Sequence, residues 1–296
     1  MASIQAIIVA KALRLQDFDW AKGSIAEQRA KQEKNARLFK LSKDVSVDRL
    51  TINGIPAEII DAPGSKPGVI LYLHGGAYAL GSVAVHREFL SRLVKASRRK
   101  VLAIDYRLAP EHPFPAALED ALAAYHWLIS EGYDPAAIVI AGDSAGGGLA
   151  LAALLSLRDS KEPLPACAVC LSPWLNLFST RETGNNNHDP ILNPAVLSTF
   201  ARLYAGQVDP RNPLISPLFA DLQGLPPVLI QAGTIEILLD EIEQFSEKAR
   251  QAGVAVELDR WQGLFHVFQI VPILPETRLS LEKIARFIDS KLDRAS

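Results

Sequence analysis

The sequence predicts an α/β fold, built on a mostly parallel sheet of about eight strands with helices on both faces. Two observations support this expectation. Short apolar runs rich in β-branched residues recur along the chain, and longer helix-forming segments separate the later runs. Strands joined by such helices pair in parallel, because each helix carries the chain back across the sheet. We expect strands at residues 47–51, 57–61, 69–73, 101–105, 138–141, 167–171, 228–232 and 254–260.

The chain is expected to divide into an N-terminal part, residues 1–45, and a core, residues 46–296. The first part has a helical pattern, and residues 26–43 are heavily charged. A length of 296 residues with 49% apolar content allows one large domain or two smaller ones, and the alternation of strands and helices favours one α/β unit. An insertion at about residues 177–217 interrupts this alternation with a polar stretch and then a helix, residues 194–205.

The composition argues against several classes of protein. The formal charge is −2, from 31 basic and 33 acidic residues, which gives no electrostatic reason for nucleic acid binding. No segment is apolar enough to span a membrane, and the short apolar run at residues 4–9 lacks the basic residues that precede the core of a signal peptide. We therefore expect a cytoplasmic protein without a nucleic acid or membrane partner.

Two cysteines, Cys167 and Cys170, form a C-x-x-C pattern inside an expected strand. Side chains three residues apart in a strand point to opposite faces, so we expect buried free thiols and no disulfide between them. No group of residues has the spacing of a metal site, and we expect neither a metal nor a cofactor.

The strongest motif is Gly-Asp-Ser-Ala-Gly at residues 142–146, which fits the G-x-S-x-G pattern of a nucleophile elbow. An expected strand precedes the motif, and a run of good helix formers follows it. A sharp strand–turn–helix connection would expose the hydroxyl of Ser144 at the end of the sheet. The small residues around Ser144 allow so tight a turn. Ser144 is therefore the candidate nucleophile.

A serine nucleophile needs a base, an acid that orients the base, and donors for the oxyanion. The segment His-Gly-Gly-Ala, residues 74–77, follows the strand expected at residues 69–73. Glycines just past a strand can present backbone N–H groups to a ligand. We assign the oxyanion hole to the amides of Gly75, Gly76 and Ala145.

Six histidines compete for the role of the base. His266 lies in a loop after the last expected strand, where the chain order nucleophile, acid, histidine places the base. The acid is expected after the strand at residues 228–232, where Glu236 and Asp240 are both available. Glu236 lies nearer the strand end, whereas Asp240 would lie one turn further on and could serve as a helix-dipole partner.

Two segments described above, residues 74–76 and 142–147, are characteristic of a known family. A third such segment lies at residues 105–116, with the sequence Asp-Tyr-Arg-Leu-Ala-Pro-Glu-His-Pro-Phe-Pro-Ala. With these three segments, the chain resembles a bacterial hormone-sensitive-lipase-type carboxylesterase of the α/β-hydrolase superfamily over nearly its whole length. The resemblance implies an α/β-hydrolase fold with a helical cap. It also implies that residues 105–116 brace the base of the active site and are not catalytic.

The acid motif of this family is Asp-Pro-Leu-x-Asp, and residues 236–240 match it in spacing. The sequence departs from the motif, with Glu236 in place of the aspartate and Ile237 in place of the proline. A glutamate can orient an imidazole as an aspartate does. The resemblance therefore implies a triad of Ser144, His266 and Glu236.

The resemblance further implies that residues 1–45 and the insertion at residues 177–217 form the cap. Cap side chains would then face the substrate, and those we expect in the pocket are Phe18, Trp20, Leu203 and Tyr204. Trp174 and Leu175 follow the strand expected at residues 167–171. We place them in the pocket as well, because ligands bind at the carboxyl ends of parallel strands.

These observations predict a serine carboxylesterase that hydrolyses small short- to medium-chain esters through an acyl-enzyme. An amidase, a lactonase or another acyl hydrolase would use the same triad. A non-catalytic ligand-binding module of the same fold is a second class, and the presence of His266 argues against it. In the family, the edge strand that here runs from Val254 to Arg260 often pairs two subunits, so a homodimer through this strand is expected.

Overall fold

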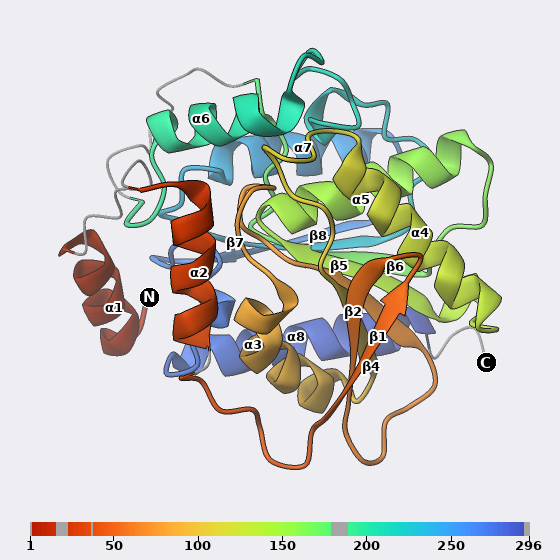
Figure 1. Ribbon diagram of the computed structural model, residues 1–296, viewed down its shortest axis with the longest axis horizontal. Coiled ribbons are helices and arrows are strands. Elements are labelled where there is room, and N and C mark those ends of the chain that lie inside the picture. Colours follow the sequence, from red (N-terminus) through yellow and green to blue (C-terminus); the bar gives the residue numbers. More distant parts are fainter. Residues whose placement is uncertain (1, 16–22, 37, 179–188, 293–296) are drawn as a thin grey trace.

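The computed structural model describes residues 2–15, 23–36, 38–178 and 189–292 (Figure 1). Its centre is an eight-stranded sheet in the order β1-β2-β4-β3-β5-β6-β7-β8. The strands are β1 (Ser46–Ile52), β2 (Ile55–Asp61), β3 (Val69–Leu73), β4 (Lys100–Ile104), β5 (Ile138–Asp143), β6 (Cys167–Leu171), β7 (Val228–Gly233) and β8 (Val256–Trp261). Every strand expected from the sequence is present, with its ends shifted by at most about two residues.

The sheet is mostly parallel. β2 runs antiparallel to both β1 and β4, and all other neighbouring strands are parallel. The strands β3, β5, β6, β7 and β8 therefore end at the same edge of the sheet. Ligands of parallel sheets bind beyond this edge, and Ser144, Glu236 and His266 all follow strands that end there. The predicted α/β fold is confirmed.

Helices cover both faces of the sheet (Figure 1). One face carries α3 (Val83–Ser97) and α8 (Pro275–Leu292), and the other carries α4 (Ala116–Ser130), α5 (Ala145–Asp159) and α7 (Leu239–Gln251). Short 3₁₀ helices lie at Pro135–Ala137, Pro217–Phe219 and Phe268–Ile270.

The two cysteines lie on opposite faces of β6. Cys167 packs in the core beneath α3 and α8, whereas Cys170 packs in the core on the α5 face. Both thiols are buried and free, as the strand pattern predicts.

Three further helices lie near the edge where the parallel strands end: α1 (Ile4–Leu15), α2 (Ile25–Ala36) and α6 (Pro194–Ala205). The bounds of α6 are those predicted, and the Asn193 side chain caps it by accepting from the Val196 amide. α1 packs Ala6 and Ala10 against the loop after β8. In the described part of the chain, none of the helices combines the length and apolarity needed to cross a bilayer.

α2 is held on the core by polar contacts, since none of its residues is buried. The guanidinium of Arg29 donates to the carbonyl of Ala79 at 2.8 Å and to that of Ala109 at 2.7 Å. One turn on, Gln32 accepts a hydrogen bond from the Gly81 amide at 3.0 Å. These contacts attach α2 to the loops that follow β3 and β4.

Candidate active site

Ser144 lies in the turn between β5 and α5, where the sequence predicts a nucleophile elbow. Its backbone has φ 52° and ψ −120°, a strained conformation for a residue with a side chain. The turn depends on close backbone approach: a Cβ added to Gly146 would lie 2.0 Å from the Leu73 carbonyl oxygen, and one added to Gly142 would lie 2.4 Å from Gly146. The small residues thus let α5 start directly against the end of β3, which holds the Ser144 hydroxyl above the sheet.

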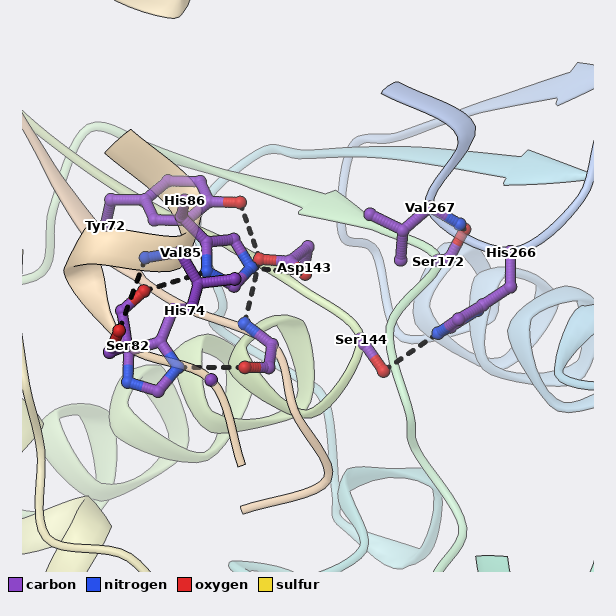
Figure 2. Close-up of polar contacts among 12 residues, drawn as sticks. Tyr72, His74, Ser82, Val85, His86, Asp143, Ser144, Ser172, His266 and Val267 are labelled. Carbon is purple, nitrogen blue, oxygen red and sulfur yellow. Dashed lines mark hydrogen bonds and ion pairs between the residues drawn. The ribbon is translucent and has the colours of Figure 1, made fainter. Parts of the chain in front are cut away.

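His266 faces this hydroxyl from the loop after β8. Its Nε2 lies 2.9 Å from the Ser144 Oγ. Figure 2 marks this contact with a dashed line. The ring is buried, and its neighbours Phe265 and Phe268 pack under α1. The nucleophile and the proposed base are therefore within hydrogen-bond distance without any rearrangement.

Glu236 lies on the far side of the imidazole, in the loop after β7. Its Oε2 is 3.6 Å from the His266 Nδ1, and the side chain is fully buried. Asp240 lies in the first turn of α7, and no contact joins it to His266 in the described part of the chain. Of the two acids that the sequence offers, the structure puts Glu236 beside the histidine.

The charge of Glu236 sets the protonation of His266. Burial by itself lowers the pKa of the imidazole, but the contact with Glu236, with Asp189 and Asp143 further away, raises it above its ordinary value. The carboxylate therefore favours the imidazolium that forms when a histidine takes a proton from serine.

The expected oxyanion donors differ from one another in the structure. The amides of Gly76 and Ala145 have no acceptor among the described residues, so they are available to a ligand. The Gly75 amide instead donates to the Asp143 Oδ1 at 2.9 Å. Our assignment of this amide to the oxyanion hole stays a prediction, in which a ligand would have to share or displace this contact with Asp143.

Residues 105–116 brace this loop, as the resemblance implies. The Tyr106 hydroxyl donates to the His74 carbonyl at 2.6 Å, and its ring stacks on that of His74 with centroids 4.3 Å apart. The Ala109 amide donates to the Tyr78 carbonyl at 2.9 Å. None of these groups contacts Ser144 or His266.

A cavity of about 330 Å³ opens at Ser144 and His266. Most of its lining is apolar and includes Trp174, Leu197 and Phe200. A cavity of this size lies at the lower end of the range found for small-molecule sites.

The predicted pocket residues are only partly placed in this lining. Trp174 lines the cavity, whereas Leu175, Leu203 and Tyr204 do not. Leu175 is fully buried in the core, since successive residues of an extended segment point in opposite directions. Tyr204 stacks on Tyr78 with ring centroids 3.6 Å apart.

On α6 the cavity is reached by earlier turns of the apolar stripe, at Val196, Leu197 and Phe200. The stripe continues to Tyr204, which packs on the core beyond the cavity. The other two predicted residues, Phe18 and Trp20, lie outside the described residues.

Sequence reasoning missed Ser172, which follows β6 and joins the acid to the base loop. Its hydroxyl donates to the Glu236 Oε2 at 2.6 Å and accepts from the Val267 amide at 3.1 Å. The backbone φ of Ser172 is 46°, a second strained residue at the site. No motif marks this serine, since its partners are distant in the sequence.

Two further carboxylates hold the walls of the site. Asp189 accepts from the Ile237 amide at 2.9 Å, which ties the insertion before α6 to the loop that carries Glu236. Glu241 accepts from the amides of Leu175 and Asn176 at 2.6 and 3.2 Å. Burial raises the pKa of Glu241 to about 8, although the two amides oppose this shift.

Comparison with known proteins agrees with this geometry. Residues 70–270 match the family described as alpha/beta hydrolase fold. The chain belongs to the α/β-hydrolase family. An acetyl-hydrolase of Streptomyces hygroscopicus is 44% identical to this hydrolase over 244 residues, which cover 81% of the chain and 82% of that relative.

Solved esterase structures share the whole fold of this hydrolase. The crystal structure of an esterase from the bacterial hormone-sensitive lipase family has a TM-score of 0.92 and 43% identity, covering 99% of this chain and 100% of that one. The esterase EstE5, in a crystal soaked with p-nitrophenyl butyrate, has a TM-score of 0.94 and 39% identity over the same shares. This hydrolase groups with the bacterial hormone-sensitive-lipase-type esterases.

Proposed function

We propose that this protein is a serine carboxylesterase that hydrolyses small short- to medium-chain esters through an acyl-enzyme on Ser144. The observation that carries the proposal is the 2.9 Å contact between the Ser144 hydroxyl and the His266 imidazole beside an apolar cavity. The esterase relatives support the same class of reaction.

In the proposed mechanism, His266 takes the Ser144 proton as the hydroxyl attacks the ester carbonyl. The amides of Gly76 and Ala145 stabilise the oxyanion, and Glu236 stabilises the imidazolium. The imidazolium then gives its proton to the departing alcohol. Water enters, His266 activates it in the same way, and the acid product leaves. No step needs a cofactor.

The acyl preference follows from the size and polarity of the cavity. Each methylene group that is buried gains about 0.8 kcal/mol, but only while the cavity has room for it. With about 330 Å³ of largely apolar space, we propose a preference for acyl chains of about two to eight carbons. EstE5 has been soaked with a butyrate ester, which falls inside this range.

Replacing Ser144 by alanine tests the proposal. We expect Ser144→Ala to lose turnover of p-nitrophenyl esters and covalent labelling by a sulfonyl fluoride, while its melting temperature stays close to that of the wild type. Residual turnover near the wild-type rate, or labelling of another serine, would move the active site elsewhere. A panel of acyl lengths on the wild type tests the chain preference, and faster hydrolysis of long-chain emulsified esters would contradict it.

Three further features are also proposals. We infer that residues 1–45 and about 177–217 act together as a cap, because α2 and α6 both line the cavity. We infer a cytoplasmic location and a homodimer through β8, which is the outermost strand at its end of the sheet. Light scattering and a disruptive proline in β8 would test the dimer.

A further inference from the structure

A second pair of a histidine and a carboxylate lies on the opposite side of Ser144 from His266 (Figure 2). His86 belongs to the first turn of α3, and Asp143 is the residue before the nucleophile. The His86 Nε2 lies 3.3 Å from the Asp143 Oδ2, and both side chains are buried. The catalytic steps proposed above do not use this pair.

Both ring nitrogens of His86 face acceptors. Nε2 faces the Asp143 carboxylate, and Nδ1 lies 3.0 Å from the Ser82 carbonyl oxygen. A neutral imidazole carries one N–H group and can donate to only one of these. Only the imidazolium satisfies both contacts, and the carboxylate provides the partner that a buried cation needs.

The carboxylate of Asp143 in turn holds the loop after β3. Its Oδ1 accepts hydrogen bonds from the Tyr72 hydroxyl at 2.7 Å and from the Gly75 amide at 2.9 Å. A Cβ on Gly75 would lie 2.1 Å from the Asp143 Oδ2, so only glycine lets the backbone pack this closely on the carboxylate. The next residue, Gly76, carries an amide that we assign to the oxyanion hole.

We propose that His86 is a positioning residue of the esterase. As an imidazolium, it holds Asp143 ionised and oriented, and Asp143 fixes the Gly75 amide and with it the backbone that presents the Gly76 amide. This inference rests on the proposed function, since it explains how that function's oxyanion donors are kept in place. A preorganised donor of this kind is worth about 10²–10³ in kcat.

The groups around His86 place the positive charge on this histidine. The titratable groups that face His86 from neighbouring elements are Asp143 of β5, Tyr72 of β3, His74 of the loop after β3, Asp105 after β4 and Glu33 of α2. Glu33 accepts a hydrogen bond from the Ser82 hydroxyl. Burial disfavours the charged ring, but Asp143, the Ser82 carbonyl and Asp105 together raise the pKa of His86 above its ordinary value.

His74, whose ring centroid is 5.6 Å from that of His86, behaves in the opposite way. Burial lowers the pKa of His74 to about 3, and its Nδ1 lies 2.8 Å from the Gly75 carbonyl oxygen. A neutral His74 with its proton on Nδ1 satisfies that contact. The loop is thus held by one neutral and one charged imidazole.

The proposal predicts a second titration in the pH profile. A raised pKa means that the His86 cation is present below that pKa and is lost as pH rises through it. His266 must be neutral to act as a base, so its titration limits activity on the acid side. His86 must be charged, so its titration lowers kcat on the alkaline side.

The test begins with ring-nitrogen NMR of the full-length protein labelled with ¹⁵N-histidine. At neutral pH we expect both His86 nitrogens to be protonated, and the signal to change together with the alkaline fall in kcat. A stable His86 signal with one unprotonated nitrogen at neutral pH overturns the proposal, and this measurement needs no variant.

The kinetic test uses His86→Gln, which keeps a donor for Asp143 but cannot carry the charge. We expect kcat to fall by about tenfold to a hundredfold with KM nearly unchanged, and the alkaline limb to disappear. A merely structural histidine would lower the melting temperature and leave that limb in place, which would refute the inference. The matched control is His126→Gln, which breaks an exposed contact with Glu162 on the α4 side and should leave the kinetics unchanged.

Covalent labelling separates this inference from the proposed function. If a sulfonyl fluoride labels Ser144 and His86→Gln has wild-type kinetics, only the positioning role fails. If Ser144 is not labelled, the proposed function itself fails, whatever the state of His86.

Discussion

Replacing Glu236 by glutamine removes one charge from the site and keeps the shape of the side chain. Glu236 is fully buried, its Oε2 lies 3.6 Å from the His266 Nδ1, and Ser172 donates to the same oxygen. A glutamine carbonyl oxygen can still accept from Ser172. The variant therefore isolates the electrostatic effect of the carboxylate on the imidazole.

The size of the effect follows from the separation of the two groups. Unit charges 3.6 Å apart attract by about 5 kcal/mol at an effective dielectric constant of about 20. This attraction acts on the imidazolium of the transition state and is absent for the neutral histidine of the resting enzyme. We expect kcat to fall by about 10³–10⁴, close to the loss of about 10⁴ for the matching change in a related triad.

Asp240→Asn is the matched control, because it removes a charge of the same sign four residues later. Asp240 lies in the first turn of α7, where an acid interacts with the helix dipole. We expect kcat within about threefold of the wild type and a loss of stability of about 0.3–1 kcal/mol. Steady-state kinetics with a p-nitrophenyl ester and thermal melts of both variants provide the measurements.

The opposite pattern would refute this reasoning. If Asp240→Asn abolishes turnover and Glu236→Gln stays near the wild-type rate, the acid motif is aligned wrongly. If both variants are active, Ser144 and His266 act without an orienting carboxylate. The melting curves would show whether a variant loses its activity because it unfolds.

Three other perturbations test the site from different directions. First, kcat/KM should fall as pH drops through the pKa of His266, which Glu236 helps to raise. In Glu236→Gln this acid limb of the pH profile should move to lower pH. A limb that stays in place would show that another group is titrating. Second, Ser172→Ala removes a hydrogen bond to the Glu236 carboxylate and should lower kcat by about tenfold with little change in KM. A tenfold rise in KM would instead show that Ser172 acts on substrate binding in the pocket. Third, Gly146→Ala places a Cβ 2.0 Å from the Leu73 oxygen and should lower the free energy of unfolding, measured in urea, by about 1–3 kcal/mol or more. The control is Gly132→Ala, whose Cβ has nothing within 4 Å and which should cost about 1 kcal/mol through its positive φ. Equal losses would show that close packing does not matter at Gly146.

The sequence predicts the strands well and also indicates the proposed triad, because both leave local patterns in the sequence. A buried strand is a short apolar run, and β6 needs only residues 167–171 to be recognised. Ser144 is marked by its own neighbours, and the ends of the parallel strands must then meet at one edge. His266 could be chosen from six histidines because its place after the last strand brings it to that edge.

What the sequence does not predict depends on side-chain direction and on partners distant in the chain. The apolar stripe of α6 is visible in the sequence, but whether Phe200 or Tyr204 reaches the cavity depends on how the helix lies on the core. The pairing of Asp143 with His86, 57 residues away, leaves no local pattern. The contact of the Gly75 amide with Asp143, 68 residues further on, likewise leaves no local pattern.

The acid loop shows how a departure from a family motif can be accommodated by its surroundings. Where the family has a proline, this chain has Ile237, whose amide donates to Asp189 at 2.9 Å; a proline has no N–H to donate. Where the family has an aspartate, this chain has the longer Glu236, and the Ser172 hydroxyl holds its Oε2 at 2.6 Å. Each of the two substitutions is therefore accompanied by a hydrogen bond. The Ile237 amide binds Asp189, in the insertion before α6, and Ser172, in the loop after β6, binds the Glu236 carboxylate. A glutamate has one more rotatable bond than an aspartate, so it loses more side-chain freedom when it is fixed. These bonds restrict that freedom, which is the condition for a glutamate to orient the His266 imidazole.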